Sequence, residues 1–178
     1  TQQRPITLLI NANSRKGRLN FRAAIHALRD AEIAVGETYA VRSQTETKQI
    51  LQREIENGAE LVIVGGGDGT LSECAGHLAH TNVAMGVLPL GTGNTFVRSV
   101  GIPLDLNGAA QTISQGHIQS IDLGKVNNQV FLNSVSLGLS VEIAGALDKR
   151  IKRRLGILAW PIIGARVVAT HRALHLRI

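Results

Sequence analysis

The sequence predicts an α/β fold in which a parallel sheet has helices on both faces. Short aliphatic runs alternate along the chain with stretches whose apolar residues recur every three or four positions, and this alternation is typical of parallel sheets. The run Leu61-Val62-Ile63-Val64 is continuously apolar, as expected for a strand that is covered on both faces. Of the 178 residues, 44% are hydrophobic and only 3% are aromatic, so we expect a core of Val, Ile, Leu and Ala.

Strands and helices alternate over the first two thirds of the chain. The expected strands are residues 6–10, 37–41, 61–64 and 83–88. Helices are expected at residues 19–31, 43–57, 71–79, 96–100 and 105–113. The sequences Ser43-Gln44-Thr45-Glu46 and Thr70-Leu71-Ser72-Glu73 both match the capping box, so helices are expected to begin at Ser43 and at Thr70. Glycines 58, 101 and 116 are expected to end three of the helices.

The pattern changes at about residue 118, where apolar residues begin to alternate with polar or small ones. Asn127-Asn128 tolerates the left-handed conformations of a hairpin turn, and the alternation resumes from Phe131 to Val141. We therefore predict a nucleotide-binding α/β domain over residues 1–117 and the beginning of a mainly antiparallel, β-rich second domain over 118–178. At the end of the sequence Leu174, Leu176 and Ile178 alternate with His175 and Arg177, without a turn or a polar tail, so we expect the second domain to be incomplete and the protein truncated.

The net charge of +6 favours anionic partners, namely nucleotides, phospholipid surfaces or nucleic acid. A basic cluster at Lys149 to Arg154 precedes an apolar stretch that contains Trp160, a combination typical of a helix at an anionic membrane surface. An ordinary core helix with a solvated basic end fits the same residues equally well. We expect no nucleic-acid partner, because the chain has no aromatic platform on which bases could stack.

The cysteine content points to a reducing compartment. Cys74 is the single cysteine, so the chain has no internal disulfide, and we expect Cys74 to be a small, buried helix residue. No apolar run reaches the roughly 18 residues of a membrane span. We therefore expect a cytoplasmic protein that associates peripherally with membranes.

Two glycine-rich loops and one polar loop are expected to meet at the carboxyl edge of the sheet. They are Gly65-Gly66-Gly67-Asp68-Gly69-Thr70 after the third strand, Gly91-Thr92-Gly93-Asn94 after the fourth, and the segment from Asn11 to Gly17 after the first. Glycines allow a phosphate to lie against the backbone, and a helix that follows at once offers unpaired N–H groups to it. Neither a Walker A sequence nor a dinucleotide-binding G-x-G-x-x-G spacing is present. A tight turn without a ligand remains the alternative for each loop taken alone.

Together these motifs resemble the catalytic domain of diacylglycerol kinases, in particular the bacterial lipid kinases, which are related to sphingosine and NAD kinases. The resemblance covers nearly the whole chain, since Ile121-Asp122-Leu123-Gly124 and Phe131-Leu132-Asn133 also resemble the family's transition into its second domain. It implies that ATP and Mg²⁺ are bound and that the substrate is diacylglycerol or a related lipid. The residues that it assigns to nucleotide binding are Asn11, Ser43, Gly65, Gly66, Gly67, Asp68, Gly69, Thr70, Glu73, Gly91, Thr92, Gly93 and Asn94.

The implied reaction transfers the γ-phosphoryl group of ATP to a lipid hydroxyl. Asp68 is the one acidic residue within the glycine loops and is the expected catalytic residue; it could hold Mg²⁺, directly or through water, or help to activate the hydroxyl. Thr95 departs from the family, many members of which have Asp at this position. The acidic residues proposed in the family as general base and as ligands of a structural Mg²⁺ are expected beyond Ile178.

Other readings of the same residues stay open. An NAD kinase would share Gly67-Asp68-Gly69-Thr70, and a module that binds nucleotide or anionic lipid without turnover would share both loops. Because part of the lipid site is expected beyond Ile178, we predict that the 178-residue chain binds nucleotide but lacks lipid kinase activity. An unpaired edge in the second domain favours dimerisation or strand exchange through residues 130–141.

Overall fold

The computed structural model describes residues 6–12, 17–127 and 129–134. The chain divides into two compact units, residues 1–133 and 134–178, and every helix and strand described below lies in the first unit. The basic cluster at 149–154, Trp160 and most of the alternating stretch from 131 onward lie outside the described residues. The domain boundary at residues 117 and 118 stays a prediction. No helix in the described ranges is long and apolar enough to cross a membrane.

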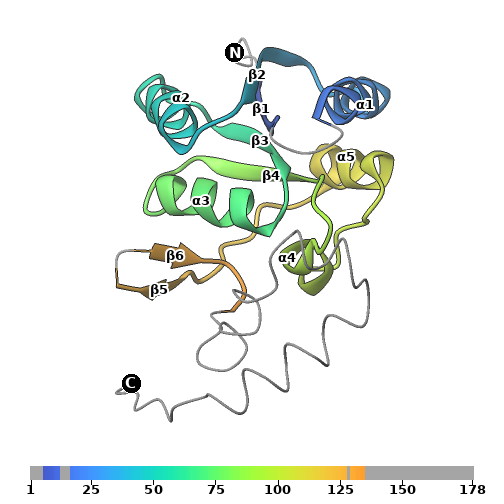
Figure 1. The fold of residues 1–178 in the computed structure, drawn as a ribbon. Coiled ribbons are helices and arrows are strands. Elements are labelled where there is room, and N and C mark those ends of the chain that lie inside the picture. The colour runs from blue at the N-terminus through green and yellow to red at the C-terminus, as the bar shows by residue number, and fades with distance from the viewer. Residues whose placement is uncertain (1–5, 13–16, 128, 135–178) are drawn as a thin grey trace, which may run out of the picture. The chain divides into compact units, whose positions relative to one another are not determined.

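The first unit is built around a parallel sheet of four strands, which confirms the predicted fold class (Figure 1). The strands are β1 (Ile6–Asn11), β2 (Val35–Val41), β3 (Leu61–Gly66) and β4 (Ala84–Pro89). Their order is β2-β1-β3-β4, so the chain moves from β1 to one side of the sheet and then returns to the other side of β1. The gap between the loops that follow β1 and β3 is therefore the point at which the strand order reverses, where α/β sheets bind their ligands.

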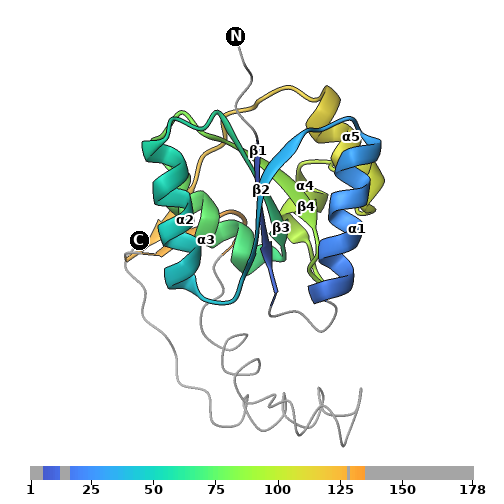
Figure 2. The ribbon, with the colours of Figure 1, turned by 90° about the horizontal axis from the view of Figure 1, so that it is seen from above.

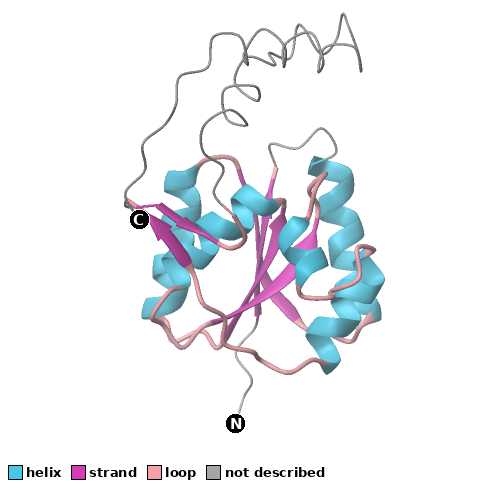
Figure 3. Cartoon of the chain, turned by 90° about the horizontal axis from the view of Figure 1, so that it is seen from below, coloured by secondary structure: helices cyan, strands magenta, loops and turns pink. Residues whose placement is uncertain are grey.

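Helices cover both faces of this sheet (Figures 2 and 3). Their bounds are α1 (Gly17–Asp30), α2 (Gln44–Glu56), α3 (Asp68–Leu78), α4 (Thr95–Ser99) and α5 (Leu106–Gln115). Helices α2 and α3 lie on one face, and α1 and α5 on the other. The left-handed backbone at Gly58 and Gly101 confirms that these glycines follow helix ends. Gly116 is the C-cap of α5, as predicted, but its backbone is extended.

Two hydrophobic cores result from the alternation of side chains along β1. Leu8 and Ile10 are fully buried with residues of α1 and α5, whereas Leu9 is fully buried with residues of α2 and α3. Strand β3 alternates in the same way, because Ile63 joins the first core and its neighbours Val62 and Val64 join the second. This arrangement explains why Leu8-Leu9-Ile10 in β1 and Leu61-Val62-Ile63-Val64 in β3 are continuous apolar runs.

The two predicted capping boxes had different outcomes. Ser43 is the N-cap of α2, and its hydroxyl accepts a hydrogen bond from the N–H of Glu46 at 3.2 Å. In a capping box the carboxylate of Glu46 would accept a hydrogen bond from the N–H of Ser43. Here it accepts from the N–H of Arg42, one residue earlier. The prediction for Thr70 is wrong, because Gly67 is the N-cap of α3 and its carbonyl accepts the first helical bond, from the N–H of Leu71.

A β-hairpin of β5 (Gly124–Val126) and β6 (Gln129–Phe131) follows α5 and packs on α3 (Figure 1). Its turn includes Asn127 with a φ of 53°, which confirms the hairpin predicted there. A Cβ atom at Gly76 of α3 would lie 3.3 Å from the side chain of Val130, so a glycine lets the hairpin approach closely. Leu132 packs against the core between α2, α3 and the sheet.

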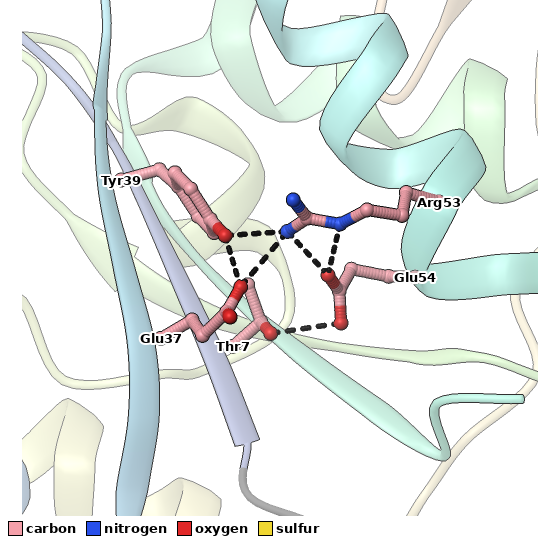
Figure 4. A network of polar contacts seen from close by, with 5 residues as sticks. All are labelled: Thr7, Glu37, Tyr39, Arg53 and Glu54. Atoms are coloured by element: carbon pink, nitrogen blue, oxygen red, sulfur yellow. Dashed lines mark hydrogen bonds and ion pairs between the residues drawn. The ribbon is translucent and has the colours of Figure 1, made fainter. Parts of the chain in front are cut away.

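Polar contacts near the start of β1 attach α2 to the sheet (Figure 4). Glu54 of α2 is buried, and one of its carboxylate oxygens accepts a hydrogen bond from the hydroxyl of Thr7 at 2.9 Å. The other oxygen accepts from the guanidinium of Arg53, which also contacts Glu37 and Tyr39 of β2. These contacts lie toward the amino ends of the strands, away from the glycine loops.

Candidate active site

The predicted site residues gather at the carboxyl edge of the sheet, as expected. Asn11 ends β1, the first glycine loop follows β3, and the second follows β4. The amide nitrogen of Asn11 donates a hydrogen bond to the hydroxyl of Thr70 at 2.8 Å. This bond joins the end of β1 to the first turn of α3 across the reversal point of the strand order.

The first glycine loop is shorter than its sequence suggests. Gly65 and Gly66 still belong to β3, and α3 begins at Asp68, so Gly67 alone separates strand from helix. The N–H groups of the first helical turn have no partner within the helix and carry the positive end of its dipole. A Cβ atom at Gly69 would meet nothing within 4 Å, so open space lies beside this turn.

The two glycine loops touch each other through their backbones. The N–H of Leu90 donates to the carbonyl of Gly66 at 3.0 Å. A Cβ atom at Gly91 would lie only 2.4 Å from the Cα atom of Gly67, a separation that excludes any side chain there. Two loops that are 24 positions apart in the sequence thus form one surface, and glycine is required because their backbones are in contact.

Asn94 determines the shape of the second loop. Its backbone is left-handed, with φ 48° and ψ 45°, and the residue is buried. Its side chain accepts a hydrogen bond from the N–H of Gly91 at 2.9 Å and donates one to the carbonyl of the same residue at 3.0 Å. Asn tolerates this conformation better than most residues, so one side chain both permits and closes the turn.

Asp68 connects the two loops. Its Oδ1 accepts a hydrogen bond from the N–H of Phe96 in α4 at 2.9 Å. Burial raises the pKa of this carboxyl, but hydrogen bonds from the Phe96 N–H and from the N–H and hydroxyl of Thr95 outweigh burial, so the pKa lies below its usual value. Asp68 is therefore ionised at neutral pH, with its negative charge held at the start of α3 and next to the second loop.

The other predicted residues are placed less closely together. Ser43 lies at the same edge of the sheet, but its hydroxyl caps α2. Thr92 and Gly93 are exposed, as a binding loop requires. One carboxylate oxygen of Glu73 is buried in α3 and has no hydrogen-bond partner among the described residues. Burial, and then the charge of Glu73, raise the pKa of the neighbouring Cys74 thiol to about 12. Cys74 is buried in α3, which confirms it as a small helix residue.

Two residues that the sequence analysis did not select contribute to the site. Thr95 helps to lower the pKa of Asp68, and a Cβ atom at Gly93 would lie 3.1 Å from Oδ2 of Asp68 and 3.5 Å from the hydroxyl oxygen of Thr95. The Nε atom of Arg98 donates to the carbonyl of Gly93 at 3.1 Å, which brings an exposed guanidinium to the second loop. Thr95 follows the glycine motif directly, and Arg98 lies one helical turn beyond it. Their closeness to the motif in the sequence was the signal that could have identified them.

The donor set at this site fits a magnesium nucleotide. Mg²⁺ in proteins is commonly held by one or two carboxylates together with waters and substrate phosphates. Asp68 supplies one ionised carboxylate beside unpaired backbone N–H groups, which suit phosphate oxygens. Among the described residues no cluster of three or more His, Cys, Asp or Glu could hold a metal ion by protein ligands alone.

The fold and the site define an α/β protein with two joined glycine loops at the carboxyl edge of its sheet. A family model described as the diacylglycerol kinase catalytic domain matches residues 5–126. The chain therefore belongs to the diacylglycerol kinase catalytic domain family, as the motifs indicated.

Relatives and solved structures agree with this family. The chain is 34% identical over 161 residues to a probable lipid kinase YegS-like protein of Pseudomonas aeruginosa, a match that covers 88% of this chain and 52% of the relative. It is 33% identical over 129 residues to a diacylglycerol kinase of Staphylococcus epidermidis, a match that covers 71% of this chain and 41% of the relative. A crystal structure of a diacylglycerol kinase from Bacillus anthracis has a TM-score of 0.63 and 28% identity, over 75% of this chain and 47% of that one. The chain thus spans about half the length of the curated relatives that it matches.

Proposed function

We propose that this chain is the nucleotide-binding part of an ATP-dependent lipid kinase, which transfers the γ-phosphoryl group to the hydroxyl of diacylglycerol or a related lipid. The observation that carries this proposal is the junction of the two glycine loops around the ionised Asp68. Family membership supports phosphoryl transfer as the chemistry, and the names of the relatives support a lipid as the acceptor.

The phosphates of ATP would lie in the open space beside Gly69. The first turn of α3 carries backbone N–H groups without partners in the helix, and a Cβ atom at Gly69 would meet no other atom within 4 Å. The full set proposed to bind nucleotide is Asn11, Ser43, Gly65, Gly66, Gly67, Asp68, Gly69, Thr70, Glu73, Gly91, Thr92, Gly93 and Asn94. Within this set, Asn11, Thr70 and Asn94 act through the shape of the loops, because their side chains are bonded to other loop atoms.

Phosphoryl transfer requires accurate positioning and stabilisation of the charge that develops on the phosphoryl oxygens. The N–H groups of the loops supply fixed donors for these oxygens. Bound with ATP, Mg²⁺ would neutralise phosphate charge, and Asp68 is the residue proposed to hold it, directly or through water. The lowered pKa of Asp68 makes it a weak proton acceptor at neutral pH, so we favour a role in cation binding and orientation over one as general base.

A phosphate-transfer assay tests this proposal. The complete gene product that contains this chain is incubated with Mg·ATP labelled in the γ-phosphate and with vesicles that contain diacylglycerol. We expect label to appear in the lipid, and we expect Asp68→Ala to abolish the transfer. Thr112→Val is the matched control, since it removes a hydroxyl bonded to a backbone carbonyl of α5, away from the loops.

The acceptor in the same assay separates the competing functions. When NAD is offered as a second acceptor, label in NAD and none in lipid would indicate an NAD kinase and not a lipid kinase. Binding of ATP without transfer to either acceptor would indicate a non-catalytic module. Wild-type turnover by Asp68→Ala would show that the site around Asp68, where the two glycine loops meet, is not the catalytic site.

A further inference from the structure

Arg98 brings a positive charge to the second glycine loop. Its Nε atom donates a hydrogen bond to the carbonyl of Gly93 at 3.1 Å, and its side chain is exposed. Gly93 in turn lies next to Asp68, because a Cβ atom at Gly93 would be 3.1 Å from Oδ2 of Asp68. The guanidinium is therefore attached to the same glycine that adjoins the carboxylate of the site.

No carboxylate among the described residues neutralises Arg98. In this part of the chain the ion pairs are formed by Arg53, which contacts two glutamates, and neither Arg98 nor Asp68 takes part in one. Arg98 and Asp68 thus share Gly93 as a neighbour without pairing with each other. Both charges are available to a ligand that needs a cation and a carboxylate side by side.

A guanidinium held in this way suits a phosphoryl group. The bond to Gly93 uses the Nε donor and fixes the direction of the planar fork, which leaves the N–H groups of both Nη atoms for a ligand. Two parallel N–H groups match two oxygens of a phosphate, a geometry that an ammonium group cannot supply. In the proposed function the reacting phosphoryl group lies near Asp68, and Arg98 is attached to the loop at that point.

We propose that Arg98 is a catalytic residue, whose guanidinium binds the oxygens of the γ-phosphoryl group that is transferred. This inference rests on the proposed function. In the transfer, the acceptor hydroxyl oxygen forms a bond to the γ-phosphorus, and the bond from this phosphorus to the bridging oxygen of ADP breaks. The electron pair stays with ADP, and the hydroxyl proton passes to water. A fixed guanidinium stabilises the negative charge on the phosphoryl oxygens during this step.

Calorimetric titration of the 178-residue chain with Mg·ATP and with Mg·ADP tests the contact. The two nucleotides differ only in the γ-phosphoryl group, so a residue that binds this group affects ATP and not ADP. A hydrogen bond to a charged group corresponds to roughly tenfold in affinity. We therefore expect Arg98→Gln to weaken Mg·ATP binding about tenfold and to leave Mg·ADP binding unchanged.

Arg29→Gln is the matched control for the loss of charge. Arg29 is exposed and lies in the last turn of α1, whereas the loop from β1 enters the first turn of this helix. Since consecutive turns at the two ends of α1 lie at opposite edges of the sheet, Arg29 is remote from the glycine loops. We expect Arg29→Gln to bind both nucleotides like the wild type.

Turnover of the complete gene product tests the catalytic role, with vesicles that contain diacylglycerol and with saturating Mg·ATP. Loss of one fixed donor from such a site costs about 10²–10³-fold in kcat, and we expect Arg98→Gln to lose at least about 10²-fold. Arg98→Lys should recover only part of this loss, because it keeps the charge without the fork. Guanidinium ion, added to Arg98→Ala at concentrations too low to denature it, should restore part of the activity.

The outcomes separate this inference from the proposed function. Equal weakening of Mg·ATP and Mg·ADP binding in Arg98→Gln would show that Arg98 only shapes the loop, and wild-type turnover by this variant would show that it is not catalytic. Either result overturns the inference and leaves the proposed function standing. A wild-type chain that binds neither nucleotide would contradict both. If Arg98→Gln fails to fold, the ratio of ATP to ADP affinity in Arg98→Lys decides, and a ratio equal to that of the wild type overturns the inference.

Discussion

At the scale of single residues, Asp68 was identified from the sequence as the one carboxylate in a glycine loop, but its partners were not. They come from a segment 28 positions away, and no local pattern announces a hydrogen bond between Asp68 and the Phe96 N–H. The same limit explains the error at Thr70. A T-x-x-E sequence was present, but β3 ends at Gly66 and Gly67 is already the N-cap, so the helix begins before the threonine.

The lowered pKa of Asp68 predicts how stability depends on pH. The folded-state pKa lies below the ordinary value of 3.8, so the ionised form is stabilised in the folded protein. This contribution is fully present above the unfolded-state pKa and is lost as the pH falls through the folded-state pKa. We expect Asp68→Asn to be less stable than the wild type at pH 7, with the difference shrinking below pH of about 4.

Urea denaturation of both proteins at pH 7 and pH 3 measures this effect. The control is Asp105→Asn, because Asp105 caps α5 through the N–H of Gly108 and belongs to neither glycine loop. A stability difference between Asp68→Asn and wild type that is equal at both pH values would contradict the assigned role of the charge.

At the scale of elements, periodicity predicted the strands and helices to within a few residues, because both cores depend on the alternation of β1 and β3. The attachment of α2 through Glu54 and Thr7 was not predicted. Glu54 is a charged residue on a helix that would ordinarily face solvent, and its burial depends on a threonine 47 positions earlier. Such pairs become visible only when the register of sheet and helix is known.

Thr7→Val tests this attachment. The substitution keeps the shape of the side chain but leaves a buried carboxylate oxygen of Glu54 without its partner, at a cost of about 1–3 kcal/mol in the free energy of unfolding. Chemical denaturation measures the loss. Because Thr7 and Asn11 lie at opposite ends of β1, we expect Mg·ATP affinity to remain that of the wild type. A variant as stable as the wild type would show that the bond contributes nothing.

At the scale of the whole molecule, the sequence predicted a change of architecture near residue 117, and the hairpin that follows confirms a change to antiparallel pairing. The sequence could not show that this hairpin packs on α3. Contact with Gly76 and the packing of the partly buried Leu132 against the core depend on three-dimensional proximity, and the alternating pattern of β6 is the same wherever it packs. The first compact unit accordingly extends to Asn133.

Truncation tests the extent of this unit. We expect residues 1–133 to unfold cooperatively, and a chain of residues 1–116 to have a lower melting temperature because it exposes the face of α3 that the hairpin covers. Differential scanning calorimetry on both chains compares them. Equal melting temperatures would show that the hairpin is not part of the folded unit.

If the space beside Gly69 receives the phosphates of ATP, Gly69→Ala should weaken nucleotide binding without unfolding the protein. Alanine has room at this position and is preferred over glycine in helices by up to about 1 kcal/mol, so the variant should be at least as stable as the wild type. A methyl group in this space would obstruct the phosphate. Calorimetric titration of the 178-residue chain with Mg·ATP should therefore give binding for the wild type and affinity at least about tenfold weaker for Gly69→Ala, with no loss of melting temperature. Equal affinity of the two proteins, or no binding by the wild type, would show that the phosphates of ATP do not lie beside Gly69.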